Sequence, residues 1–300
     1  MEIREFDYLS TPKIEEDITL CLGFFDGVHL GHQKLIQAAK KEGYKVAVLT
    51  FDNPPAAVTG KVLEYLSLSS ISDKVEYLEE LGVDYFLLMH FDKNVMGLTK
   101  DEFIDDVIRV INPKKIYCGT DYRFGIRAEG NPDYLSLYFD VTSFSLEKTN
   151  GKKISSRDIV NEILNGNMPE AKALLGRNYR INGLVVEGNH RGHMIDFPTA
   201  NLSLDYPYVF PHIGVYIGYA TVYDVKYRAI IEVGTHPTIL PLPKPIIEVH
   251  ILDFDGNIYG KDIFVEFVKF IRDEKKFPSV DALKVQLEED KKTAKKFLRL

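Results

Sequence analysis

The feature that most constrains this 300-residue sequence is a change in hydrophobic periodicity near residue 176. Before it, short apolar runs alternate with segments of helical period. After it, short apolar runs follow one another between Gly, Pro, Asn and Asp residues. Alternating strands and helices need crossover connections and form a parallel sheet with helices on both faces. Closely spaced strands favour a small antiparallel barrel. We therefore expect an α/β domain over 1–176 and a barrel domain over 177–300.

The expected elements follow from these periodicities. In the first half the predicted strands are 18–24, 45–51, 84–89 and 115–119, and the predicted helices are 30–42, 72–81, 101–111, 156–165 and 169–175. In the second half we predict six strands, 180–187, 199–202, 214–223, 227–233, 246–254 and 263–270, and a C-terminal helix over 280–299. Ligands of doubly wound sheets bind beyond the carboxyl ends of the strands, where the Gly-rich turns fall.

Composition excludes several classes of protein. A formal net charge of −7 disfavours a dedicated nucleic-acid-binding protein. No apolar run approaches the roughly 18 residues of a transmembrane helix, and the N-terminus lacks the apolar segment of a signal peptide. Cys21 and Cys118 form no metal-type spacing and no disulfide framework. We expect a cytoplasmic enzyme with small-molecule substrates and with no nucleic-acid or membrane partner; the oligomeric state stays open.

The first candidate site lies where the first strand meets the first helix, in the run GFFDGVHLGH at 23–32. Gly23 and Gly27 permit a tight turn that brings backbone N–H groups close to an anion, and a helix N-terminus adds partial positive charge. His29 and His32, three apart, share one face of the first helical turn. Two imidazole donors suit the stabilisation of charge on a phosphorus centre. The alternatives are a zinc pair and a capped turn with surface histidines.

A second motif, GTDYRFG at 119–125, follows another predicted parallel strand. The Asp121 carboxylate can accept hydrogen bonds from the donors of a ring or a ribose. Tyr122 and Phe124 offer aromatic faces on which a ring can stack.

A third motif, KISSR at 153–157, precedes a predicted helix. The hydroxyls of Ser155 and Ser156, together with the Arg157 guanidinium, would bind phosphate at a helix N-terminus. The alternative is that one of the serines serves only as the N-cap of the helix.

Two motifs of the second half carry further candidates. Thr199 and Asn201 are two apart, so their side chains point to one face of a strand, and their oxygens are ligands that Mg²⁺ accepts beside waters and phosphate oxygens. In the run 246–252, Glu248 and His250 alternate with apolar residues. A solvent-facing glutamate is the simplest interpretation of Glu248; a carboxylate base for a hydroxyl nucleophile is the functional one.

Together these motifs resemble the bifunctional prokaryotic FAD synthetase family, which joins an FMN adenylyltransferase to a riboflavin kinase. The similarity covers almost the whole chain and keeps the order GFFDGVHLGH, TFDNPP, GTDYRFG, KISSRDI, GLVVEG, FPTANL, GVY, GTHPT, IEVHILDFDGNIYGK and IRDEKKF. The resemblance implies a Rossmann-like nucleotidyltransferase domain over 1–176. It also implies a six-stranded riboflavin-kinase barrel with a C-terminal helix over 177–300. The implied reactions use ATP and Mg²⁺ to convert riboflavin to FMN and FMN to FAD.

The resemblance also implies residue roles. Glu248 becomes the catalytic base of the kinase, and His29 and His32 become catalytic groups of adenylyl transfer. The residues implied in binding ATP or its phosphates are Gly23, Phe24, Phe25, Asp26, Gly27, Ser155, Ser156, Arg157, Thr199 and Asn201. Those implied in binding flavin are Asp121, Phe124 and Arg272. Thr199 and Asn201 are also the implied Mg²⁺ ligands.

The sequence departs from the family pattern at a few positions. Pro54 replaces a histidine, Arg157 a threonine, Val160 an arginine, Asp196 a glycine and Glu232 an asparagine. A carboxylate near bound phosphates weakens binding by repulsion unless a cation intervenes. Two alternatives to the bifunctional enzyme therefore stay open: an enzyme with only one of the activities, and a flavin-binding regulatory protein without turnover.

Overall fold

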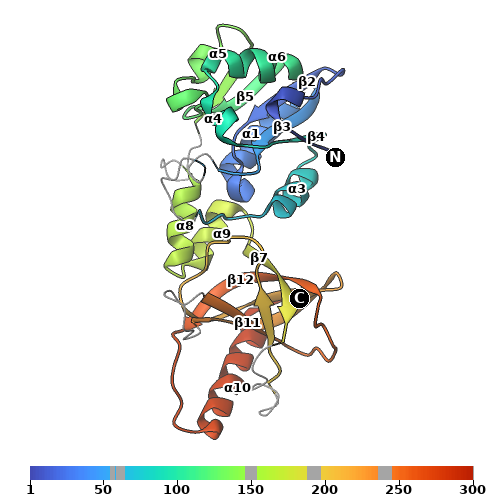
Figure 1. Ribbon diagram of the computed structural model, residues 1–300. Coiled ribbons are helices and arrows are strands. Elements are labelled where there is room, and N and C mark those ends of the chain that lie inside the picture. Colours follow the sequence, from blue (N-terminus) through green and yellow to red (C-terminus); the bar gives the residue numbers. More distant parts are fainter. Residues whose placement is uncertain (55–57, 59–64, 146–153, 188–196, 236–244, 300) are drawn as a thin grey trace. The chain divides into compact units, whose positions relative to one another are not determined.

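Figure 1 shows the computed structural model, which describes residues 1–54, 58, 65–145, 154–187, 197–235 and 245–299. Contacts divide the chain into two compact units, Met1–Ser156 and Arg157–Leu300, which we call the first and second units.

The first unit is built on a six-stranded sheet in the order β1-β4-β3-β2-β5-β6. All of its pairings are parallel. The strands are β1 (Glu2–Phe6), β2 (Ile18–Leu22), β3 (Lys45–Phe51), β4 (Tyr85–Met89), β5 (Lys115–Gly119) and β6 (Val141–Phe144). The four predicted strands and the parallel sheet are confirmed. The two edge strands, β1 and β6, were not predicted.

Helices cover both faces of this sheet (Figure 1). Val46 and Val48 of β3 pack with α1 (Leu30–Lys40) and α3 (Ile71–Glu80). Ala47 and Leu49 point to the opposite face. That face is covered by one continuous helical segment composed of α5 (Lys100–Phe103), a π-helical turn η3 (Ile104–Ile108) and α6 (Arg109–Ile111). The alternation of the apolar side chains along β3 thus supplies two cores.

Short helical segments complete the first unit. They are η1 (Tyr8–Ser10), η2 (Asp26–Val28), α4 (Lys93–Gly97), η4 (Ile126–Ala128) and α7 (Pro132–Leu135).

The strand order of the first sheet reverses at β2. The chain moves outward from β2 to β3 and β4, and later returns to place β5 on the other side of β2. A crevice opens at such a switch point, beyond the carboxyl ends of the two strands. The 23–32 motif follows β2 and the 119–125 motif follows β5, so both motifs meet at this crevice.

The second unit is a closed six-stranded barrel in the order β10-β11-β8-β7-β12-β9. Its pairings are antiparallel. The strands are β7 (Tyr179–Val186), β8 (Ala200–Ser203), β9 (Gly214–Val222), β10 (Val225–Thr235), β11 (Pro245–Ile251) and β12 (Asp262–Arg272). The predicted six-stranded barrel is confirmed.

Three helices belong to the second unit or lead into it: α8 (Ser156–Leu164), α9 (Met168–Leu175) and α10 (Val280–Phe297). α10 packs on β9 and β10, with Ala294 and Leu298 buried against the barrel wall. α9 packs on β7 and β12 and buries Met168 and Leu175. The second compact unit therefore begins before residue 176, the boundary expected from the sequence, because α9 contributes its apolar face to the barrel.

Candidate active sites

A cavity of about 320 Å³ lies at the switch point of the first sheet. Most of the first-unit candidates line it: Gly23, Phe24, Phe25, His29, His32, Asp121, Ser155 and Ser156. Motifs that are almost 100 residues apart in the sequence thus meet around one space. Tyr122, Arg123 and Phe51 also line it.

His29 and His32 form a stacked pair at the start of α1. Their ring centroids are 3.7 Å apart with an interplanar angle of 17°. His29 is the N-cap, and its Nδ1 accepts the backbone N–H of His32 at 3.4 Å, which leaves the proton of a neutral ring on Nε2. Imidazole donors are therefore held beside the positive end of the helix dipole, an arrangement suited to an anionic ligand.

The turn before the histidines has an unusual backbone. Phe25, Gly27 and Val28 have φ values of 52°, 70° and 38°. Left-handed values cost free energy for non-glycine residues and persist only where the surrounding structure enforces them. Two contacts from a distant segment and a helix do so: Ser69 Oγ accepts the N–H of Gly27 at 2.9 Å, and Lys74 Nζ donates to the Phe24 carbonyl at 3.1 Å.

Asp26 points beneath the turn rather than into the cavity. Its buried carboxylate accepts the Ser67 hydroxyl at 2.6 Å and the Leu68 N–H at 2.9 Å. Burial raises the pKa of Asp26, while the Lys74 charge and these hydrogen bonds lower it. The expectation that Asp26 binds ATP phosphates is therefore corrected: a carboxylate with these partners fixes the turn.

Lys74, on α3, is a residue that sequence reasoning missed. It is almost fully buried, and its ammonium lies 3.9 Å from the centroid of the Phe24 ring. Burial lowers the pKa of Lys74 to about 8, and the Asp26 carboxylate opposes that shift. From the sequence, a lysine in an amphipathic helix is expected at the surface. Its role becomes visible only from its burial and its hydrogen bond to the turn.

Phe124 does not line the cavity, which corrects its expected place in the flavin site. Its ring is buried 5.4 Å from the Phe103 ring in the core beneath the sheet. Phe124 also exchanges backbone hydrogen bonds with Gly130, where a Cβ would lie 2.5 Å from the ring. The neighbouring Tyr122 is the aromatic residue at the cavity wall.

The 153–157 motif reaches the same cavity through its serines. Ser156 Oγ donates to the carbonyl of Asp26 at 3.2 Å, which ties the start of α8 to the turn. Arg157 is exposed and is the first residue of the second unit, and its phosphate contact stays a prediction. Lys153 lies outside the described residues.

In the barrel, strand register aligns the second set of candidates. Asn201 on β8 is directly opposite Glu248 on β11, and Glu248 is directly opposite Glu232 on β10. Glu232 is opposite Val215 on β9, and Val215 is opposite Arg272 on β12. Residues paired in this way point to the same face of the sheet. We call the line Asn201–Glu248–Glu232–Val215–Arg272 the register row.

Thr199 joins this row through its hydroxyl. It lies immediately before β8, and its Oγ1 donates to Glu248 Oε2 at 3.2 Å. The hydroxyl of Thr199, the amide oxygen of Asn201 and the carboxylate of Glu248 form a set of hard oxygen donors, the chemistry that Mg²⁺ accepts together with phosphate oxygens. The donor set therefore fits a magnesium ion.

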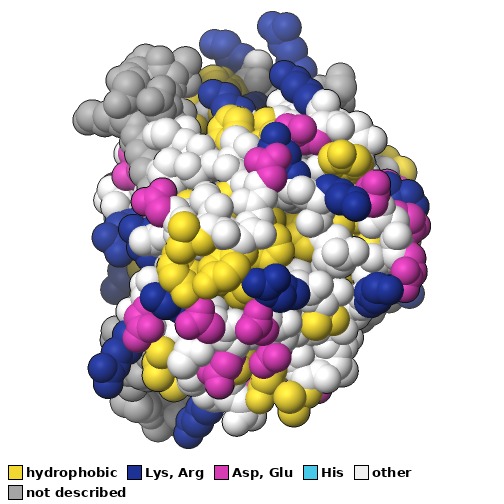
Figure 2. All heavy atoms as spheres, turned by 90° about the horizontal axis from the view of Figure 1, so that it is seen from above, with side chains coloured by type: hydrophobic (Ala, Val, Ile, Leu, Met, Phe, Trp, Pro, Cys, Tyr) yellow, Lys and Arg dark blue, Asp and Glu magenta, His cyan; other side chains and the backbone are white. Residues whose placement is uncertain are grey.

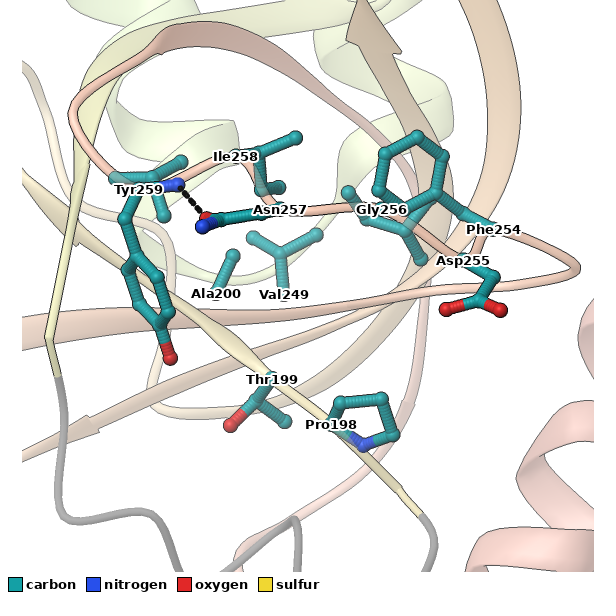
Figure 3. A pocket seen from close by; sticks show the side chains of 12 residues that line it. Pro198, Thr199, Ala200, Val249, Phe254, Asp255, Gly256, Asn257, Ile258 and Tyr259 are labelled. Atoms are coloured by element: carbon teal, nitrogen blue, oxygen red, sulfur yellow. Dashed lines mark hydrogen bonds between the residues drawn. The ribbon is translucent and has the colours of Figure 1, made fainter.

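A cavity of about 260 Å³ opens beside Thr199 (Figure 3). Residues of the segment between β11 and β12 form one wall, with Pro198 and Thr199 opposite. The floor is apolar and includes Ala200 and Val249. The 254–259 wall was part of a motif quoted from the sequence, but no role was predicted for it, because an irregular segment gives no periodicity from which to infer a pocket.

Arg272 is held at the other end of the register row. Its Nη2 lies 2.8 Å from Asp290 Oδ2 on α10, and the two side chains are 12% and 5% exposed. Arg272 and Asp290 also border a cavity of about 450 Å³ between β12 and α10.

Glu232 occupies the space between the two ends of the row. Desolvation by the surrounding side chains raises the pKa of Glu232, the neighbouring Glu248 and Glu274 carboxylates add to the shift, and Arg272 opposes it. Of the other departures, Pro54 and Val160 are described, whereas Asp196 lies outside the described residues.

The described ranges contain no group of three or more His, Cys, Asp or Glu side chains arranged to hold a metal ion. Within these ranges, the histidine pair therefore has no third ligand of these types with which to bind zinc.

In the same described ranges, no helix is long and apolar enough to span a membrane. On the face drawn in Figure 2, Lys and Arg side chains are interspersed with Asp and Glu around hydrophobic side chains.

Comparisons with known proteins agree with this two-site arrangement. A family model described as FAD synthetase matches residues 11–163, and one described as riboflavin kinase matches residues 175–298. The bifunctional riboflavin kinase/FMN adenylyltransferase of Listeria monocytogenes is 35% identical over 304 residues, which cover 97% of each chain. The protein of the same description from Bacillus subtilis is 36% identical over 286 residues, covering 92% of this chain and 90% of that one.

A solved structure shares the whole fold. It is described as a macrolide-efflux protein from Streptococcus pneumoniae, is 33% identical, and aligns with a TM-score of 0.90 over 99% of this chain and 100% of its own.

Proposed function

The chain belongs to the family of bifunctional riboflavin kinases/FMN adenylyltransferases, and from that premise we propose how its residues divide the two reactions. The chain phosphorylates riboflavin to FMN and adenylylates FMN to FAD, with ATP and flavins as substrates. The assignment of one reaction to each unit rests on one observation: each unit has its own candidate site for phosphate chemistry. These sites are the histidine pair at the switch-point cavity and the register row on the barrel. We place the functional boundary at residue 176, as the sequence indicates.

In the kinase reaction, Glu248 is the base. It takes the proton of the terminal ribityl hydroxyl as that oxygen attacks the γ-phosphorus of ATP. The bond from the γ-phosphorus to the β–γ bridging oxygen breaks, and ADP leaves with that oxygen. Thr199 orients this carboxylate through its 3.2 Å hydrogen bond. A carboxylate held in one orientation keeps an oxygen lone pair directed at the proton of the attacking hydroxyl.

Thr199 and Asn201 are the proposed ligands of a magnesium ion, which would neutralise charge on the phosphates when bound. The apolar cavity beside Thr199 has the size and lining that suit the base of ATP, and the adjacent polar row suits its phosphates. ATP thus lies on the β8 side of Glu248.

In the adenylyl-transfer reaction, the phosphate oxygen of FMN attacks the α-phosphorus of ATP and pyrophosphate leaves. The nucleophile is already an anion, so the site needs donors rather than a base. His29, His32 and the backbone of the glycine turn supply them at the positive end of α1. Asp121 and Tyr122 line the same cavity and would contact the ring or ribose of a substrate.

Arg272 borders the cavity beside α10 and remains the proposed flavin contact of the kinase site. We also propose that the protein acts in the cytoplasm on small molecules alone. The formal net charge of −7 supports the absence of a nucleic-acid partner, as do the interspersed charges on the one face that Figure 2 draws.

Chromatographic separation of flavins tests the proposal on the unmodified protein. One reaction contains riboflavin, ATP and Mg²⁺, and a parallel one contains FMN, ATP and Mg²⁺. We expect FAD in both, and none without Mg²⁺. FMN in the first with no FAD in the second would mean that only the kinase is active. FAD in the second alone would mean that only the adenylyltransferase is active. Flavin binding without any product would identify a binding protein.

A further inference from the structure

We propose that Glu232 accepts hydrogen bonds from the ribityl hydroxyls of riboflavin and thereby selects flavins with a polyol side chain. The inference rests on the kinase function proposed for the second unit and assigns a specificity residue to that site. Glu232 lies in the register row one strand away from Glu248.

The in-line geometry of phosphoryl transfer determines which side of Glu248 the flavin occupies. ATP lies toward Asn201 and Thr199, on the β8 side. The nucleophile and the leaving group stand on opposite sides of the transferred phosphorus, so riboflavin approaches from the β10 side. Glu232 is the residue directly opposite Glu248 on β10.

The spacing of the strands also agrees with the length of a ribityl chain. Neighbouring strands lie about 4.8 Å apart. A ribityl chain whose terminal hydroxyl contacts Glu248 spans that distance and brings its other three hydroxyls across β10. Arg272, at the far end of the row, borders the cavity in which the ring would lie.

The Glu232 carboxylate is accessible and has no hydrogen-bond or ion-pair partner within the part of the chain that the structure describes. Its charge is left without a donor because Arg272, the nearest cation of the row, is bonded to Asp290 and to the Asp273 carbonyl. Hydroxyl groups can donate hydrogen bonds to the Glu232 carboxylate and so offset its repulsion by the Glu248 and Glu274 carboxylates. Unlike a cation, they do not neutralise its charge. A polyol is therefore a complementary ligand for this position.

The test compares two flavins that share the reacting group. The probes are riboflavin and 10-(5-hydroxypentyl)-7,8-dimethylisoalloxazine, which keeps the terminal hydroxyl and lacks the other three. Affinity is measured by flavin fluorescence, and kcat/KM by product chromatography, on the full-length chain. For Glu232→Val we expect riboflavin affinity and kcat/KM to fall roughly 10- to 100-fold, the range for a lost charged hydrogen bond. The values for the hydroxypentyl flavin should change little.

Two further variants support the comparison. Glu232→Gln keeps an acceptor oxygen in nearly the same shape, so it should retain part of the preference for riboflavin. Glu274→Gln removes a neighbouring negative charge outside the row and should leave the preference unchanged. Thermal unfolding followed by circular dichroism reports on folding of the second unit in each preparation, and FAD formation from FMN by the first unit shows that equal amounts of active chain are compared.

An equal loss for both flavins in Glu232→Val and Glu232→Gln would overturn the proposal. An altered Mg²⁺ requirement with unchanged flavin preference would also overturn it and would make Glu232 a cation ligand. The binding measurement does not need turnover. A protein that lacks kinase activity would contradict the proposed function, while its two affinities would still decide the role of Glu232.

Discussion

Single side chains beneath the glycine turn determine the shape of the cavity proposed for adenylyl transfer. Phe25 and Val28 have left-handed backbone conformations that neither residue favours. Asp26 and Lys74 hold the turn from below, one through the 67–68 segment and the other through the Phe24 carbonyl. The groups that face the ligand are therefore positioned by buried residues that do not touch it.

Asp26→Asn tests this support. The amide oxygen can still accept the Ser67 hydroxyl and the Leu68 N–H, which both bond to Oδ1, but the amide nitrogen replaces Oδ2, which accepts the Tyr65 hydroxyl at 3.3 Å. The buried Lys74 ammonium also loses the negative charge that Asp26 supplies. We expect a loss of about 1–3 kcal/mol in the free energy of unfolding of the first unit. FAD formation from FMN should fall, and FMN formation from riboflavin should persist. Urea unfolding and flavin chromatography measure both effects, with exposed Asp105→Asn as the control. A stable variant with full FAD formation would contradict the assignment.

Thr199→Val tests the orientation of the catalytic base. The change removes the hydroxyl that donates to Glu248 and one proposed oxygen ligand for Mg²⁺, at nearly constant volume. We expect kcat/KM for riboflavin to fall roughly 10- to 100-fold, with a higher Mg²⁺ concentration needed for half the maximal rate. Thr221→Val, on β9 outside the row, should leave the rate unchanged. An unaltered rate in Thr199→Val would exclude both roles.

At the scale of elements, the barrel and its C-terminal helix are joined by a largely buried ion pair. Arg272 ends β12 and bonds to Asp290 of α10 through two nitrogens. Breaking such a pair leaves a charge without compensation, which costs more than the intact pair contributes. The wall beside the proposed flavin cavity therefore depends on a strand–helix contact.

For Asp290→Asn we expect a loss of about 3 kcal/mol in the free energy of unfolding of the second unit. The double variant Arg272→Met with Asp290→Leu should recover much of that stability, because no buried charge remains. Thermal unfolding followed by circular dichroism gives both values. If the single variant were as stable as the unmodified chain, the pair would have no structural role.

The ends of β3 and β4 are linked by a pH-sensitive contact. His90 Nδ1 lies 3.0 Å from Asp52 Oδ2, and this hydrogen bond raises the pKa of His90. A histidine whose folded-state pKa is raised stabilises the fold fully below its ordinary value of 6.5, and the contribution disappears as the pH rises through the folded-state pKa.

The corresponding prediction compares urea midpoints of the unmodified chain and His90→Gln. The unmodified chain should be the more stable one at about pH 5.5, and the difference should shrink toward zero at about pH 8.5. Because the His90 side chain is 42% exposed, the difference should be small. A difference that grows with pH would contradict the pair.

The sequence predicted the central elements because each carries an unambiguous period. β1 was missed because EIREF lies at a sheet edge and mixes charged with apolar residues. β6 was missed because VTSF is short and mostly half-buried. Motif membership placed Phe124 in the flavin site, but its ring packs on Gly130, and no local pattern distinguishes the two orientations. No local pattern predicts the buried orientation of Asp26 either, since its partner Ser67 lies 41 residues away in the sequence.

For the whole molecule, we propose that each of the two compact units carries out one reaction. The first unit presents donors for an already anionic nucleophile, and the second presents a carboxylate base for a neutral hydroxyl. Each unit has its own core. The residues that line the switch-point cavity belong to the first unit, and those of the register row belong to the second. Damage to one site should therefore leave the other reaction intact.

The most direct measurement is the flavin product pattern of two single variants, each supplied with ATP and Mg²⁺. Glu248→Gln should make no FMN from riboflavin but should convert FMN to FAD at the rate of the unmodified chain. His29→Ala should convert riboflavin to FMN and accumulate it, with little FAD. Loss of both products in either variant, while its unfolding midpoint stays unchanged, would contradict the assignment of the two reactions to separate sites.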